Sequence, residues 1–220
     1  GVGGVVEFIG MGQALSQNRI VRRGAVREAK IVGRRHGWVA AQRLSAGALP
    51  VDGQAQLLGK VGEGFVSFMK TLDLGRLTLG AACLGGAQAA LDWSVTWAKT
   101  RKQLGPALAH KQSVQWKIAN TAVEVEALRS LVYRVAWMVD TGQPFTHLAA
   151  MVKLYGSEVA SRAIDAALQI HGGLGYTRDF PIERAFRDAR IAEIFEGTNE
   201  IQRIVIASNI FREHGVRIRP

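Results

Sequence analysis

Residues 169–203 read QIHGGLGYTRDFPIERAFRDARIAEIFEGTNEIQR, and this segment is the most informative part of the sequence. Three glycines within 172–175 predict the end of one helix and a turn where the backbone can approach a ligand closely. The simpler alternative is a plain turn between packed helices. Further along, the pattern predicts a short helix over 181–192 and another over 198–213. The glycines are not a dinucleotide-binding fingerprint, because a helix rather than a strand precedes them.

Three longer helices are predicted upstream, at residues 62–99, 110–141 and 146–171, where apolar residues recur at helical spacing. Gly142 and Pro144 end the second of them, as a C-terminal glycine followed by a proline does. Helices joined by short glycine or proline turns describe an antiparallel bundle. The fold class predicted is therefore mainly α.

The first long helix contains four glycines, each of which lowers helix propensity by up to about 1 kcal/mol. A helix that tolerates them is expected to pack closely against its neighbours at these positions. They are Gly75, Gly80, Gly85 and Gly86.

Residues 1–58 show no clean hydrophobic period and are rich in glycine, valine and arginine. Strand-like pieces at Val2–Ile9 and Trp38–Leu44 are possible. We place a domain boundary near residue 58. The segment before it is expected to be part of a β-domain or an irregular basic segment, and residues 59–220 the helical bundle.

Composition limits the classes of protein that need to be considered. The 220 residues carry a formal net charge of +10, and 48% of them are hydrophobic, which is typical of a globular protein. Excess positive charge serves nucleic acid or nucleotide cofactors, or is simply a solvated basic loop. The single cysteine, Cys83, excludes an intrachain disulfide. His171 has no second histidine at metal-ligand spacing, so no metal site is expected.

Two short segments carry residues suited to chemistry. Glu196 precedes Gly197 and Thr198, where a new helix can begin, and the helix dipole there favours a charged carboxylate. The alternative is an acid that only caps the helix. After the first long helix, Arg101 and Lys102 form a cationic turn that could meet phosphates. Its alternative is a basic helix end that complements the dipole.

Taken together and in order, the motifs of residues 56–212 resemble the acyl-CoA dehydrogenase family. Each motif alone is weakly specific, whereas seven of them in the right order and spacing are highly specific. They are Gly62–Phe65, Leu72–Arg76, Arg101–Gly105, Gln112–Gln115, Ala150–Leu154, Gln169–Thr177 and Phe195–Arg203.

The resemblance implies a flavin-dependent α,β-dehydrogenation of an acyl-CoA thioester to the trans-2-enoyl-CoA. In the family a glutamate before Gly-Thr takes the α-proton, and Glu196 matches it. The backbone N–H of that glutamate and a flavin hydroxyl polarise the thioester carbonyl. One subgroup, typified by isovaleryl-CoA dehydrogenase, carries its glutamate on the long helix instead. That position here is Gly75, which cannot act as a base.

The same resemblance implies binding residues for FAD and substrate. The implied FAD contacts are Arg101, Gln103, Gln112, Gln169, Gly173, Thr198 and Glu200, with Arg101, Gln103 and Gln112 reaching the FAD of a neighbouring subunit. The implied acyl-CoA contacts are Asp73, Arg76 and Gly197. A site shared between subunits implies a homo-oligomer, a dimer or a tetramer. The expected electron acceptor is an electron-transfer flavoprotein, and the expected location is the cytoplasm of a bacterium or the mitochondrial matrix of a eukaryote.

The sequence also departs from the family pattern. Leu104 stands where the family usually has a phenylalanine beside the flavin, and residues 1–55 resemble the family's middle β-domain only faintly. The family's N-terminal helical domain is not seen. These departures keep alternatives open: a truncated or degenerate family member that acts as a non-catalytic binding or assembly protein, an acyl-CoA oxidase, or a nucleic-acid-binding protein.

Overall fold

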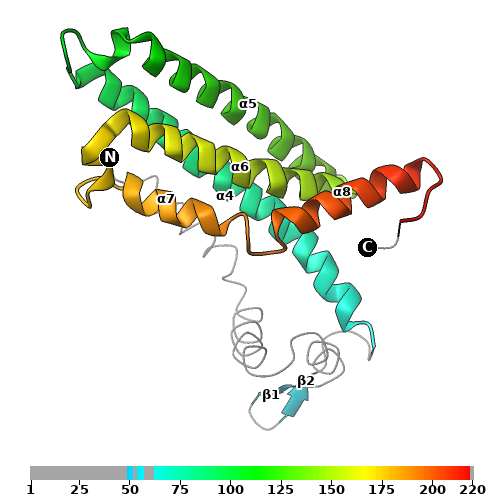
Figure 1. Ribbon diagram of the computed structural model, residues 1–220. Helices are drawn as coiled ribbons and strands as arrows, with labels where there is room; N and C mark the ends of the chain where they lie inside the picture. The colour runs from blue at the N-terminus through cyan, green and yellow to red at the C-terminus, as the bar shows by residue number, and fades with distance from the viewer. Residues whose placement is uncertain (1–48, 52–53, 57–61, 219–220) are drawn as a thin grey trace. The chain divides into compact units, whose positions relative to one another are not determined.

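The computed structural model describes residues 49–51, 54–56 and 62–218. They form two strands, β1 (Leu49–Val51) and β2 (Gln54–Gln56), and five α-helices. The helices are α4 (Gly64–Thr100), α5 (Gln112–Asp140), α6 (Thr146–His171), α7 (Ile182–Ile191) and α8 (Asn199–Glu213), with 3₁₀ turns η1 (Leu108–His110) and η2 (Gly172–Tyr176) (Figure 1). All five predicted helices are present, with ends within two residues of those expected.

The chain divides into two compact units. One contains the hairpin and the residues of α4 up to Leu74, and the other contains the described residues from Gly75 onward. In the hairpin, β1 and β2 pair antiparallel with Pro50 opposite Ala55. The strand-like pieces Val2–Ile9 and Trp38–Leu44 lie outside the described residues. The domain boundary near residue 58 stays a prediction.

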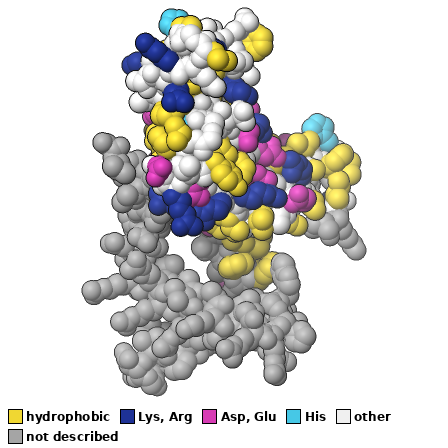
Figure 2. Space-filling view, turned by 60° about the vertical axis from the view of Figure 1, so that its left-hand side comes forward, with side chains coloured by type: hydrophobic (Ala, Val, Ile, Leu, Met, Phe, Trp, Pro, Cys, Tyr) yellow, Lys and Arg dark blue, Asp and Glu magenta, His cyan; other side chains and the backbone are white. Residues whose placement is uncertain are grey.

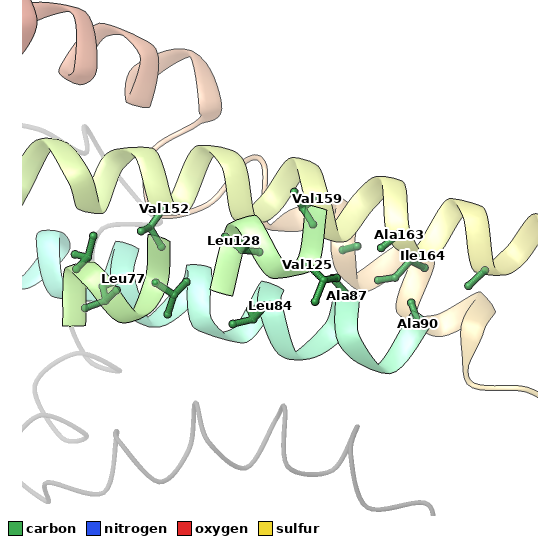
Figure 3. Packing of buried hydrophobic residues seen from close by; sticks show 14 of the residues in the cluster. Leu77, Leu84, Ala87, Ala90, Val125, Leu128, Val152, Val159, Ala163 and Ile164 are labelled. Atoms are coloured by element: carbon green, nitrogen blue, oxygen red, sulfur yellow. The ribbon is translucent and has the colours of Figure 1, made fainter. Parts of the chain in front are cut away.

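The second unit is an antiparallel bundle whose core lies between α4, α5 and α6 (Figure 3). The three helices are long enough to bury a continuous apolar stripe from each side. The core side chains that Figure 3 labels are Leu77, Leu84, Ala87 and Ala90 from α4, Val125 and Leu128 from α5, and Val152, Val159, Ala163 and Ile164 from α6. The predicted mainly helical fold is confirmed. No helix among the described residues is long and apolar enough to cross a membrane.

Two glycines let α4 and α6 approach each other closely. A Cβ at Gly80 would lie 2.1 Å from Val152 Cγ1, and a Cβ at Gly156 would lie 3.2 Å from the Cα of Gly80. Neither position can carry a side chain without moving the facing helix. The close packing expected of the glycine-rich helix is thus confirmed at Gly80.

Beyond α6, the chain turns through η2 and α7 runs back along α6 (Figure 1). Gly175 allows this turn, since a Cβ there would lie 2.7 Å from His171 Cβ. The turn after α7 then leads into α8, which packs on α6. Exposed ion pairs join neighbouring helices, Arg162 with Glu124 of α5 and Arg203 with Glu158 of α6. Pairs of this kind stabilise little individually.

Candidate active site

The candidate base Glu196 lies in the turn between α7 and α8 with a left-handed backbone. Its φ is 54°, and the φ of Gly197 is 88°. A left-handed conformation costs a residue other than glycine about 1–2 kcal/mol. Such strain persists where the surrounding structure imposes it, and it concentrates at functional sites. The strain at Glu196 therefore marks this turn as a candidate site.

The carboxylate of Glu196 lies directly over Gly75 of α4. A Cβ at Gly75 would be 2.8 Å from Glu196 Oε2, so the absence of a side chain there makes room for the acid. Glu196 Oε2 is buried and has no hydrogen-bond partner among the described residues. Gly75, which cannot act as a base itself, thus lies next to the candidate base Glu196.

Burial and nearby charges set the protonation of Glu196. Burial raises the pKa of its carboxyl above the ordinary range, and the positive charges of Lys153 and Arg76 oppose that rise. Arg76, a predicted substrate contact, is only 3% exposed. A carboxylate tuned in this way, with an oxygen free of hydrogen bonds, is suited to accept a proton. The predicted substrate contact Asp73 precedes Arg76 on α4 but belongs to the other compact unit.

Hydrogen bonds hold the turn that carries Glu196. Gln202 of α8 is fully buried and its Nε2 donates to the carbonyl of Gly197 at 2.9 Å. A Cβ at Gly197 would lie 2.7 Å from that nitrogen, so this glycine cannot be replaced without displacing Gln202. On the other side, the backbone N–H of Asn199 donates to the carbonyl of Glu193 at 3.0 Å, and Ser161 Oγ donates to Glu193 Oε1 at 2.6 Å.

Thr198 and Glu200 lie at the first turn of α8. Thr198 is the N-cap, and its hydroxyl accepts from the backbone N–H of Ile201 at 3.4 Å. Two hydrogen bonds lower the pKa of Glu200: the larger effect comes from the backbone N–H of Glu200 itself, and a smaller one comes from the Thr198 side chain. Thr198 therefore caps α8, and Glu200 lies in the first turn of that helix. Their predicted contacts with FAD stay a prediction.

Sequence reasoning missed a buried polar cluster beneath this turn. Lys153 and Ser157 of α6 meet Asn199, the first residue of α8, and all three are buried. Lys153 Nζ donates to Asn199 Oδ1 at 2.8 Å. A signal was present: Lys153, Gly156, Ser157 and Ala160 follow helical spacing, and such a spacing places a lysine on the same face as small residues within an apolar helix.

Four of the predicted FAD contacts line one pocket, at the end of the bundle away from Glu196. Arg101, Gln103, Gln169 and Gly173 line a pocket of about 630 Å³ between the end of α4, the start of α5 and the end of α6. Gln112, the first residue of α5, lies between two lining residues, Lys111 and Ser113, but is not itself among the lining residues. Figure 2 turns this end of the bundle forward and shows Lys and Arg side chains among hydrophobic ones.

An aromatic cluster forms one wall of this pocket. Trp97 and His171 stack with ring centroids 5.0 Å apart, and Phe180 meets both rings edge-on. Arg101 lies over Trp97, 5.8 Å from the ring centroid. Burial lowers the pKa of His171, so its ring is neutral near pH 7 and offers an aromatic surface rather than a charge. The wall combines flat rings with a cation.

The turn after α4 carries Arg101 and Gln103 on a short bridge between Lys102 and Ala107. At its tip Leu104 has a φ of 52° and is 92% exposed. The leucine that departs from the family pattern therefore projects into solvent.

The predicted FAD contacts divide into two sets in this chain. Thr198 and Glu200 start α8, which meets α6 at Lys153 and Ser157, whereas the pocket lies at His171, at the end of α6. His171 lies 14 positions after Ser157, which corresponds to about 21 Å along the helix. The two sets do not line one pocket within this single chain, as expected if each set serves a site shared between subunits.

The fold and the buried acid define a helical-bundle domain with a candidate proton-accepting site. Residues 62–211 match the family model described as acyl-CoA dehydrogenase, C-terminal domain. This chain belongs to the acyl-CoA dehydrogenase family.

Individual relatives agree with this family. A probable acyl-CoA dehydrogenase of Bacillus subtilis (strain 168) is 48% identical over 158 residues, which cover 72% of this chain and 42% of that protein. The mitochondrial short-chain specific acyl-CoA dehydrogenase of Bos taurus is 47% identical over 158 residues, covering 72% of this chain and 38% of the relative. Butyryl-CoA dehydrogenase from Megasphaera elsdenii superposes with a TM-score of 0.69 at 44% identity, covering 70% of this chain and 40% of the other. The chain thus spans about two fifths of the length of these relatives.

Proposed function

We propose that this chain supplies the base of a flavin-dependent acyl-CoA dehydrogenase. The observation that carries the proposal is the Glu196 carboxylate, held in a strained turn over Gly75 with a buried oxygen that has no hydrogen-bond partner in the part of the chain that the structure describes. Glu196 takes the α-proton of the acyl thioester, and the β-hydrogen leaves with its electron pair, so that the substrate becomes the trans-2-enoyl-CoA. FAD, when bound, supplies the acceptor for that hydride.

The residues of the far pocket fit a nucleotide cofactor. Arg101, Lys111 and Lys117 bring positive charge suited to a pyrophosphate, and the Trp97–His171 wall is suited to a flat ring. Gly172 and Gly173 would each meet nothing within 4 Å if they carried a Cβ, so the backbone is open on that side. We therefore assign this pocket to part of an FAD that is shared with a second copy of the chain. Thr198 and Glu200 would meet the FAD at the other end.

Replacing Arg101 with alanine is expected to weaken FAD binding about 10–100-fold, since a charged hydrogen-bond donor contributes on the order of 1.5–3 kcal/mol. The dissociation constant of FAD is measured by fluorescence titration of the complete encoded protein. Arg212→Ala, which removes an exposed arginine from α8, is the matched control. Equal affinity in Arg101→Ala and the control would contradict the assignment of the pocket.

Replacing Gly75 with alanine is expected to slow α-proton exchange about 100-fold, since a misplacement near 1 Å can cost that much. The new methyl group would lie 2.8 Å from Glu196 Oε2 and would push the carboxylate away. Exchange is followed by NMR as deuterium enters the α-position of the acyl-CoA. Gly85→Ala, at an exposed glycine of the same helix, is the control. An unchanged rate in Gly75→Ala would argue against the placement of the base.

The substrate, electron acceptor and location are further parts of the proposal. The names of the bovine relative and of the Megasphaera structure favour short-chain acyl-CoA thioesters, with butyryl-CoA the first to assay. By the family resemblance we propose electron-transfer flavoprotein as the acceptor, a dimer or tetramer as the assembly, and the cytoplasm or the mitochondrial matrix as the location. A panel of acyl-CoA thioesters assayed with and without oxygen tests the substrate class and separates a dehydrogenase from an oxidase.

The alternative of a non-catalytic binding or assembly protein makes a different prediction. Such a protein would purify without a flavin spectrum, and added FAD would not raise its melting temperature. A yellow protein whose flavin is bleached by an acyl-CoA supports the enzyme instead.

A further inference from the structure

Lys153 is a buried cation that takes no direct part in the proposed proton transfer. Its side chain is 0% exposed in the middle of α6. Taking an ammonium group out of water is unfavourable unless opposite charge and hydrogen bonds compensate. An apolar residue would fill this position in a helix core at less cost, so the lysine calls for a specific explanation.

The hydrogen bonds of Lys153 lead to the turn that carries the base. Its Nζ donates to Asn199 Oδ1 at 2.8 Å, and Ser157 Oγ lies 3.1 Å from that oxygen and 3.0 Å from Asn199 Nδ2. Asn199 lies three residues after Glu196, and its backbone N–H closes the turn on Glu193. The cluster thus fixes the start of α8 to α6.

The charge of Lys153 also acts on Glu196 directly. Among the described residues, the charged groups that act on this carboxyl are Lys153 from α6 and Arg76 from α4, and both favour its ionised form. Lys153 in turn interacts with Glu193, Glu200 and the buried thiol of Cys83. Burial lowers the pKa of Lys153, whereas the negative charges around it, that of Glu196 among them, act in the opposite direction. Through this attraction Glu196 and Lys153 each favour the charged form of the other.

We propose that Lys153 is a positioning residue for the Glu196 base, acting through Asn199 on the geometry of the turn and through its buried charge on the carboxylate. This inference rests on the proposed function of Glu196. It gives a role to a fully buried lysine that donates a hydrogen bond to the first residue of α8.

Removing the positive charge of Lys153 should shift the pH dependence of α-proton exchange in a defined direction. A carboxylate that has lost a nearby cation binds a proton more readily, so its pKa rises further in Lys153→Met. The base is then protonated up to a higher pH. In Lys153→Met, the rate of α-proton exchange should fall at least about tenfold at the acidic end of its pH profile. The rate should recover as the pH rises and the carboxyl ionises. A lysine with only a structural role would lower the rate equally at every pH.

Two variants test the proposal. Lys153→Met removes the charge, whereas Asn199→Asp keeps the shape of the cluster and places a negative charge against Lys153. Both should move the acid limb of α-proton exchange to higher pH in the complete encoded protein. Ser94→Ala, which removes a buried hydroxyl that donates to the Ala90 carbonyl of α4, controls for loss of a buried polar group and should leave the limb in place.

A second readout does not depend on activity. The ¹³C resonance of the Glu196 carboxyl, assigned by its absence in Glu196→Gln, is titrated in the full chain and in both variants. A higher midpoint in Lys153→Met supports the proposal. If Lys153→Met does not fold, Lys153→Gln, which also removes the charge but keeps a polar side chain, replaces it, because the added charge of Asn199→Asp would by itself raise the midpoint. Midpoints equal to that of the unsubstituted chain would overturn it. Exchange that survives Glu196→Gln would instead contradict the proposed function, while the titration would still test the coupling.

Discussion

Replacing Glu196 with glutamine should lower the rate of α-proton exchange by a factor on the order of 10²–10⁴, the usual contribution of a general base. Glutamine keeps the size of the side chain but cannot accept the proton. The fold should be retained, because Glu196 Oε2 makes no hydrogen bond within the described residues. Exchange is measured by deuterium uptake into the acyl-CoA, and folding by circular dichroism.

The control for this substitution is Glu213→Gln, which changes the same residue type at an exposed position near the end of α8. It should exchange at the unsubstituted rate. Near-normal exchange in Glu196→Gln would mean that another group takes the α-proton. Gly75 cannot be that group, so such a result would place the base outside the two family positions.

Replacing Gly80 with alanine should lower the free energy of unfolding by about 1–3 kcal/mol, the usual penalty for overpacking a core. The new Cβ would lie 2.1 Å from Val152 Cγ1 and 3.0 Å from the Val152 carbonyl oxygen, so α4 and α6 would have to separate. The better helix propensity of alanine offsets only about 1 kcal/mol of this loss. Urea denaturation followed by circular dichroism measures the change.

Gly85→Ala is the matched control for this prediction, since Gly85 is an exposed glycine on the same helix. It should leave stability unchanged or raise it by up to about 1 kcal/mol. The double variant Gly80→Ala/Val152→Ala should recover part of the loss, because it removes Cγ1 from the clash. Equal stability of Gly80→Ala and Gly85→Ala would contradict the close approach of the two helices.

The helices were predictable because each is marked locally. Apolar residues repeat at helical spacing, and Gly142 and Pro144 end α5 much as the glycines of η2 end α6. Close packing of α4 at Gly80 was predicted, but the residue that packs against it, Val152, was not. The two residues are 72 positions apart in the sequence. Local spacing carries no information about which helix faces which glycine.

In the candidate site, too, some residues could be predicted from local motifs and others could not. Glu196, Arg101 and Gln169 could be named from ordered motifs, whereas Lys153 could not be assigned to the Glu196 turn until α8 was seen to pack on α6. A buried lysine and an exposed one look alike in sequence, since burial is decided by the neighbours that pack around the residue. The separation of the FAD contacts into two sets likewise required the positions of the helices.

The five helices, the family resemblance and the choice of Glu196 as the candidate base could all be predicted from the sequence, because periodicity, helix-ending residues and motif order are local properties of the chain. The left-handed backbone of Glu196, its position over Gly75 and its interaction with the charge of Lys153 depend instead on how the helices pack. The physical reason is that the strain, desolvation and charge at Glu196 arise from α4, α6 and α8 meeting at one place. These helices are distant in sequence, and their mutual packing gives an ordinary glutamate the environment of a base.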